Sequence, residues 1–276
     1  MLRGGGESPM PKALIIAPCF EIATQEWYPW LVYYLAPQLK ARGVEPVLVQ
    51  GDKATRENVW KLLTDEEIRA ILGVGHGNDN VYTGQNYDEI FVSCQYPSET
   101  IRNRCFAPVS CLVGRGLLPD MVEKGLGCGL GEITVYVFYF QPGVDPLQDW
   151  VLALFTKSEF VYAISLAEGK TSGEAHAAMI KAYYDAADKI RDIDPEIAYT
   201  LEADADNRHH FGDPDWKLVE GPPPAPGKYI CPWCEWSTDE PHLMKDHIWN
   251  MHIWPELQPC WLPRFIRKIL GCPIKR

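Results

Sequence analysis

The sequence has no long hydrophobic run and no excess of basic residues, and both absences narrow its possible roles. No segment approaches the ~18 uninterrupted apolar residues that a membrane-spanning helix needs. The glycine- and proline-rich first residues lack the apolar centre of a secretory signal. With 26 Lys and Arg against 37 Asp and Glu, the formal net charge is −11, which disfavours general phosphate binding. We therefore expect a cytoplasmic protein that binds neither membranes nor nucleic acid.

The cysteines do not have the pattern of a secreted disulfide framework. There are nine of them, an odd number, and Cys231 and Cys234 have the spacing of a metal site. We interpret the set as belonging to a reducing compartment, with cysteines used for zinc, for catalysis and as small core residues.

Short apolar segments alternate with helical segments along most of the chain. The pattern predicts strands at 13–17, 46–49, 70–74, 106–110 and 133–140, with a sixth candidate at 160–166. It predicts helices at 26–42, 55–63, 117–124, 147–155 and 172–191, and a loop-rich stretch at 78–104. We expect Pro29 and Pro37 to trim or bend the first helix. Such alternation predicts the α/β class, with a mostly parallel sheet covered by helices on both faces.

Proline and glycine mark the expected domain boundaries. Residues 1–11 read as a flexible leader, and Gly-Pro-Pro-Pro-Ala-Pro-Gly at 221–227 reads as a semi-rigid linker. The main domain is therefore expected at 12–220, followed by a small finger at 228–253 and a tail at 254–276.

Two residues with catalytic chemistry follow neighbouring predicted strands. His76 comes just after the segment at 70–74, and Cys111 just after the one at 106–110. Functional groups of open α/β sheets gather beyond the carboxyl ends of the strands. If these strands are neighbours, their spacing of ~4.8 Å brings both side chains within reach of one substrate. An imidazole base activates a thiol as a nucleophile, and the N–H groups of Gly77 and Cys111 would form an oxyanion hole.

An apolar strand ending in His-Gly, followed by one ending in a small residue and Cys, resembles the clan of caspases, gingipains, legumains and clostripain. Residues 71–77 and 106–111 carry the two halves. The glycine-rich segment 124–132 and the Phe-Gly-Asp-Pro segment 211–214 resemble the gingipain branch. The resemblance covers about residues 12–220.

This resemblance implies a three-layer caspase-like domain with cysteine endopeptidase activity. Cys111 would form a thioester with the substrate, and His76 would act first as general base and then as general acid. The Ser110-Cys111-Leu112 segment departs from the Gln-Ala-Cys sequence of true caspases. Caspase-type specificity for aspartate is therefore not implied.

Acidic residues near the expected cleft suggest a preference for basic substrates. Glu21 follows the first strand and would pair with Arg or Lys before the scissile bond. Asp79 and Asp88, in the loop after the histidine, are rival candidates for the same role. A solvated surface glutamate is the alternative interpretation of Glu21, and His209 and His210 are interpreted as surface or structural histidines.

A non-catalytic adaptor is the alternative function. A cysteine at a strand end is often only a small core residue, and a domain can keep its fold while losing its activity. Such an adaptor would bind a protein, in preference to nucleic acid, through the inactive cleft and the finger.

The C-terminal region contains the spacing C-x2-C-x12-H-x4-H. Its cysteine and histidine residues supply the four ligands of a tetrahedral structural zinc site: Cys231, Cys234, His247 and His252. The segment resembles the two-Cys, two-His finger family, whose fold is ββα. A single finger reads about three base pairs, too few for specific DNA binding. We therefore expect this finger to pack on the main domain or on a protein partner.

Overall fold

The computed structural model describes residues 10–219, 229–230 and 237–238. The chain divides into two compact units, Met1–Ala225 and Pro226–Arg276. The predicted linker at 221–227 and tail at 254–276 lie outside the described residues, as does the predicted leader up to residue 9.

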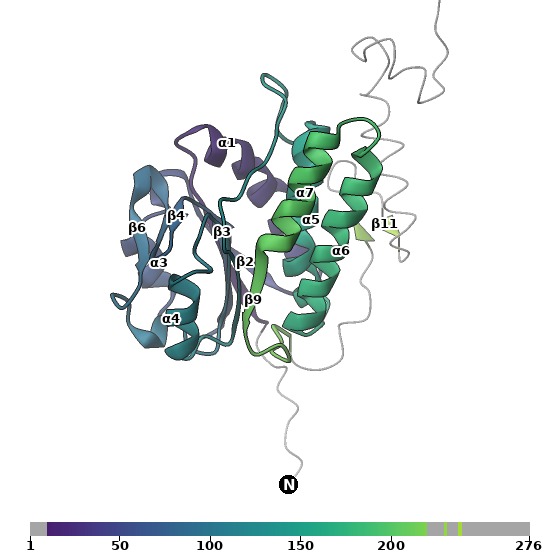
Figure 1. Ribbon diagram of the computed structural model, residues 1–276. Helices are drawn as coiled ribbons and strands as arrows, with labels where there is room; N and C mark the ends of the chain where they lie inside the picture. Colours follow the sequence, from purple (N-terminus) through teal and green to yellow (C-terminus); the bar gives the residue numbers. More distant parts are fainter. Residues whose placement is uncertain (1–9, 220–228, 231–236, 239–276) are drawn as a thin grey trace, which may run out of the picture. The chain divides into compact units, whose positions relative to one another are not determined.

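A six-stranded sheet forms the centre of the first unit (Figure 1). In sheet order its strands are β2 (Glu45–Gln50), β1 (Lys12–Ala17), β3 (Ile68–Val74), β7 (Cys105–Val109), β8 (Cys128–Glu132) and β9 (Arg208–Gly212). All strand pairs are parallel except β8 with β9. The predicted α/β class with a mostly parallel sheet is confirmed.

Helices cover the sheet on both faces. One face carries α1 (Ile22–Pro29), a π-helical turn (Trp30–Leu35), α2 (Ala36–Lys40), α5 (Trp150–Ala167), α6 (Ser172–Ile190) and α7 (Pro195–Asn207). The other carries α3 (Arg56–Leu62), α4 (Leu117–Glu123) and a small antiparallel sheet of β4 (Gly77–Asn78), β5 (Val81–Thr83) and β6 (Glu89–Val92) (Figure 1). Short 3-10 helices lie at Gly51–Lys53, Gln85–Tyr87 and Ser98–Thr100.

Strand β1 shows why an uninterrupted apolar run suits this position. Ala13, Ile15 and Ala17 belong to the core on the α5 side. Leu14 and Ile16 belong to the core on the α3 side. Successive side chains of a strand point to opposite faces, so a strand covered on both faces needs apolar residues throughout.

The helical stretch at 26–42 begins earlier than predicted and continues past both prolines. The turn between Pro29 and Pro37 is π-helical, Trp30–Leu35. Proline cannot donate the α-helical hydrogen bond and its ring crowds the preceding turn, so a widened turn accommodates it without ending the helix.

The strand predicted at 133–140 is wrong, because the fifth strand is β8 at Cys128–Glu132. Segment 133–140 belongs to no strand, although its β-branched and aromatic composition favours one. The place beside β8 is taken by β9, which pairs with it from Cys128↔Gly212 to Glu132↔Arg208.

The strand predicted at 160–166 is also wrong, because a single helix, α5, runs to Ala167. A helix buried on most sides has the same continuous apolar pattern as a buried strand. Among the described residues, α5 is the one helix that length and composition would allow to cross a membrane, and 67% of it is buried inside the protein. It lies on the sheet face that also carries α6 and α7.

Two elements near the end of the domain were not predicted, and the loop-rich stretch at 78–104 contains the small sheet. Asp194 is the N-cap of helix α7, and its side chain accepts hydrogen bonds from the N–H groups of Glu196 and Ile197. Strand β9 contains only one strongly apolar side chain, Phe211, so its composition gives no strand signal.

Candidate active site

The candidate pair His76 and Cys111 lies just past the ends of two neighbouring strands. Strands β3 and β7 are paired in parallel up to Val74↔Val109. The pairing extends one step further, because the N–H of Gly75 donates to the carbonyl of Val109 at 3.1 Å. A Cβ on Gly77 would lie 2.2 Å from Ser110 Oγ, so only glycine allows this approach. The residues after His76 therefore pack directly on the residues around Cys111.

The imidazole of His76 lies beside residues that follow the end of β1. Its Nε2 lies 3.3 Å from Oε1 of Glu21, at an angle that does not make a hydrogen bond. Two aromatic rings flank it, Tyr87 at 5.0 Å and Phe20 at 6.2 Å between ring centroids. The His76 carbonyl accepts hydrogen bonds from both the N–H and the hydroxyl of Thr83, which fixes the backbone here.

Glu21 is the N-cap of α1. Its two carboxylate oxygens accept hydrogen bonds from the N–H groups of Ala23, at 2.9 Å, and Thr24, at 2.7 Å. Partial burial by itself raises the pKa of this carboxyl, but those N–H groups and the nearby His76 outweigh burial and the pKa is lowered. Glu21 therefore holds a negative charge against His76 and is already engaged by the helix.

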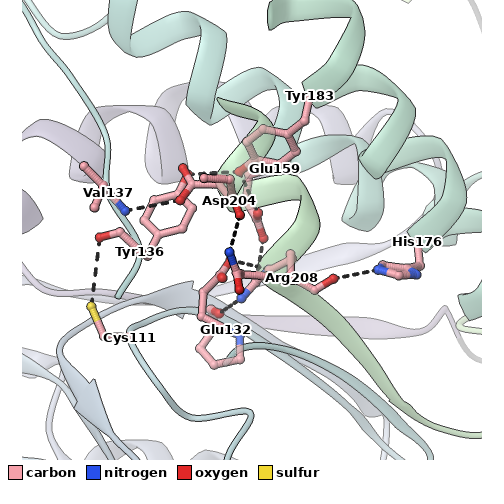
Figure 2. A network of polar contacts seen from close by, with 12 residues as sticks. Cys111, Glu132, Tyr136, Val137, Glu159, His176, Tyr183, Asp204 and Arg208 are labelled. Atoms are coloured by element: carbon pink, nitrogen blue, oxygen red, sulfur yellow. Dashed lines mark hydrogen bonds and ion pairs between the residues drawn. The ribbon is translucent and has the colours of Figure 1, made fainter. Parts of the chain in front are cut away.

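The thiol of Cys111 is half-buried and lies on the β8 side of its strand. Its Sγ is 4.0 Å from the carbonyl oxygen of Tyr136 (Figure 2). Burial raises the pKa of this thiol, and the carboxyls of Glu132 and Asp204 add to the rise. Within the part of the chain that the structure describes, no hydrogen bond joins Cys111 to His76.

A buried cluster of charged side chains lies next to Cys111 (Figure 2). At its centre is Arg208 of β9, whose guanidinium forms an ion pair with Glu159 of α5. A second arginine nitrogen donates to the carbonyl of Pro108 at 2.8 Å, and Nε lies 3.8 Å from Glu132. Arg208 and Glu132 are both essentially inaccessible to solvent.

Tyrosine hydroxyls connect this cluster to the strand tip that carries Cys111. The hydroxyl of Tyr183 donates to Glu159 at 3.0 Å and lies 3.0 Å from the hydroxyl of Tyr136. Tyr136 in turn provides the carbonyl that faces the Cys111 thiol. Asp204 accepts from the N–H of Val137 at 3.3 Å, one residue further on (Figure 2). The sequence analysis did not predict this network. Its only trace in the sequence is a charged residue inside an otherwise apolar segment, such as Glu159 in α5.

The cluster holds three carboxyls against one arginine, so its charge balance depends on protonation. Burial raises the pKa of Glu132 to about 8, with Glu159 adding to the rise and Arg208 opposing it. Burial likewise raises the pKa of Asp204 to about 9, with help from Glu132. At neutral pH both are uncharged, and the ion pair of Arg208 with Glu159 remains.

We expect the protein to lose stability as pH rises, because Glu132 and Asp204 keep their protons in the folded state only. The unfolded chain releases them near pH ~4, the folded chain near pH 8 to 9, so unfolding becomes progressively easier across that window. Each pKa unit corresponds to ~1.4 kcal/mol, so the total change is several kcal/mol.

Urea denaturation at several pH values measures this effect. Asp204→Asn should flatten the pH dependence, whereas Asp206→Asn, at an exposed position of the same helix, should keep it. A wild-type free energy of unfolding that rises steadily from about pH 5 to 8 would contradict the protonated cluster.

The remaining predicted site residues are engaged elsewhere or lie outside the described residues. Asp79 is half-buried and lies 3.6 Å from Arg115, and Asp88 accepts from the N–H of Arg56 at the start of α3. His209 is exposed, while His210 lies 2.9 Å from the Ser172 hydroxyl.

The predicted zinc ligands, Cys231, Cys234, His247 and His252, lie outside the described residues. The described part of this unit is an antiparallel pair of strands, β10 (Tyr229–Ile230) and β11 (Ser237–Thr238). Among the residues that the structure does describe, no group of three or more His, Cys, Asp or Glu side chains is placed to hold a metal ion.

Comparison with known proteins adds no assignment. No family model matches the sequence, and no curated protein matches it.

Proposed function

We propose that this chain is a cysteine endopeptidase with a caspase-like domain, closest to the gingipain-type branch. The observation that carries the proposal is the pairing of β3 with β7, which puts His76 and Cys111 at adjacent strand tips. Gly77 packed on Ser110 keeps the two loops together. A substrate carbonyl lying across these tips would be within reach of both side chains.

In this mechanism the thiol proton passes to His76 as sulfur attacks the substrate carbonyl. The N–H groups of Gly77 and Cys111 would stabilise the oxyanion. The proton then moves from the imidazolium to the departing amine, leaving a thioester at Cys111, and water activated by His76 releases the acid. Because Nε2 faces Glu21, Nδ1 is the nitrogen available for these transfers.

The raised pKa of Cys111 favours general-base catalysis over a preformed thiolate. Burial keeps the resting thiol protonated, so its proton must be removed during the attack. The same feature, together with the missing hydrogen bond to His76, favours the alternative of an inactive adaptor that binds a protein partner.

Segment 133–140 is the proposed docking edge for the acyl side of the substrate. Val135 and Val137 are 59% and 43% exposed, and Tyr136 between them faces the Cys111 thiol. A segment with strand-forming residues and no strand partner can pair with an extended peptide.

The experiment that tests this function is labelling of the intact protein with a thiol-directed peptide warhead, followed by mapping of the modified residue. We expect labelling at Cys111 and its loss in Cys111→Ala. Cys19→Ser is the matched control, because Cys19 is also half-buried and burial raises the pKa of its thiol too. Absence of labelling at Cys111 would support the adaptor.

Glu21 is proposed as the residue that positions His76, a role that the sequence did not assign. Glu21→Gln should lower kcat by about 100-fold with little change in KM, because the carboxylate beside Nε2 no longer holds the ring in the orientation needed for proton transfer. Thr24→Val is the matched control: Thr24 completes the same helix cap but does not contact His76. A kcat in Glu21→Gln equal to that of Thr24→Val would reject this role.

The original prediction for Glu21 or Asp79, binding of a basic residue before the scissile bond, remains a proposal. Its test is a panel of fluorogenic peptides that differ only at that residue. Equal rates for Arg, Lys and Asp peptides would reject it.

A structural zinc ion is proposed for the second unit. Strands β10 and β11 pair directly before and after the segment that holds Cys231 and Cys234, as the ββα arrangement requires. Metal analysis of the intact protein should find zinc, and Cys234→Ser should reduce it; zinc content equal in both would reject this site.

A further inference from the structure

An aromatic group beside His76 is built on a strained turn. The 3-10 turn Gln85–Tyr87 contains two consecutive non-glycine residues with left-handed backbone, Asn86 at φ 52° and Tyr87 at φ 63°. Bulky L-residues rarely adopt this conformation, because Cβ comes too close to the backbone. Such strain persists where the surroundings over-determine it, often at ligand sites.

Side chains on both sides of the turn hold it in place. The buried Gln85 accepts from the N–H of Cys19 at 2.8 Å and donates to Asp52 at 3.1 Å. Its own N–H donates to the carbonyl of Ala54 at 2.8 Å. Asp88, after the strained pair, accepts from the N–H of Arg56. The turn is thus tied to the end of β1 and to the start of α3.

The turn places the ring of Tyr87 beside the rings of His76 and Phe20. The Tyr87 ring lies 5.0 Å from the His76 ring and 4.9 Å, edge-on, from the Phe20 ring. Yet Tyr87 is 58% exposed, so the ring rests on His76 and Phe20 with much of its surface open to solvent. An aromatic ring that served only to stabilise the core would be buried, whereas the ring of Tyr87 is largely open to solvent.

The chemistry of the pair indicates which part of a substrate would meet Tyr87. The Cys111 thiol faces Tyr136 on the β8 side, whereas His76 faces Phe20, Glu21 and Tyr87 on the β1 side. His76 delivers its proton to the departing amine, so groups around it border the leaving part of the peptide. Glu21 lies beside His76, and Asp52 and Asp88 accept hydrogen bonds at the two ends of the turn; these carboxylates disfavour an acidic side chain there.

We propose that Tyr87 and Phe20 form a subsite for an aromatic or aliphatic side chain directly after the scissile bond. The inference rests on the proposed peptidase function and adds a substrate class to it. Aromatic faces bind apolar side chains by burial and by edge contacts, and one such pocket discriminates by about tenfold or more.

A peptide series varied only at the residue after the scissile bond tests this subsite. We expect the wild type to cleave Leu and Phe peptides about tenfold faster, by kcat/KM, than Ala or Asp peptides. Tyr87→Ala should remove that preference, mainly through KM. Tyr87→Gly should do the same while its thermal stability is retained, because glycine accepts the left-handed backbone without strain. Tyr33→Ala, which removes a tyrosine that is also 58% exposed, should keep the preference.

The outcomes separate the two proposals. A wild type that prefers Leu and Phe and a Tyr87→Ala variant with the same preference would reject the subsite alone. Failure of the wild type to cleave any peptide, together with no warhead labelling at Cys111, would reject both.

Discussion

Replacing Cys111 by alanine is expected to reduce peptide hydrolysis by ~10⁴-fold or more, because covalent catalysis has no substitute nucleophile. The fold should survive, since the change removes only one sulfur atom from a half-buried site whose nearest polar contact is the distant Tyr136 carbonyl. Initial rates with the best peptide of the panel, beside circular dichroism and zinc content, measure the effect.

Other cysteines provide controls for this prediction. Cys19→Ala changes a half-buried thiol just after β1, and Cys94→Ala changes an exposed thiol that is hydrogen-bonded to Asp120. Both should retain activity, because the Cys19 contact to Gln85 is made by its backbone N–H and the Cys94 thiol bonds only to Asp120 among the described side chains. Hydrolysis that persists in Cys111→Ala at the wild-type rate would show that the sulfur takes no part in the reaction.

Replacing Arg208 by methionine is expected to destabilise the protein by about 3–5 kcal/mol, the effect of breaking a buried ion pair from one side. Arg208 is 1% exposed and its guanidinium contacts Glu159, Glu132 and the Pro108 carbonyl. Methionine fills most of the space but leaves the Glu159 carboxylate buried without its cation. Chemical denaturation measures the change in unfolding free energy.

A double variant distinguishes lost charge pairing from lost packing. Glu159→Gln added to Arg208→Met should recover part of the loss, because the unpaired charge is gone. Arg191→Met is the surface control: Arg191 pairs with Glu202 and Asp188 in an exposed setting and should have little effect. Equal losses for Arg208→Met and the double variant would mean that packing alone accounts for the effect.

Much of the sheet and the position of the candidate pair could be predicted because their signals are local. The apolar runs of β1, β3 and β7 reflect burial on both faces. His76 and Cys111 are recognisable because each directly follows such a run. The helix predicted at 172–191 is likewise found, at Ser172–Ile190, and the structure adds that Thr171 caps its start.

Only the tertiary structure decided which strand lies beside β8 and which partners Arg208 and His76 meet. These features depend on contacts between segments that are far apart in the sequence. Segment 133–140 has strand-forming residues, but β9 takes the place beside β8. The ion pair of Arg208 joins residues 49 positions apart, and Glu21 reaches His76 only because β1 and β3 are neighbours. Composition and periodicity encode burial and backbone preference along the chain; they do not encode the partner that each buried charge meets across the sheet.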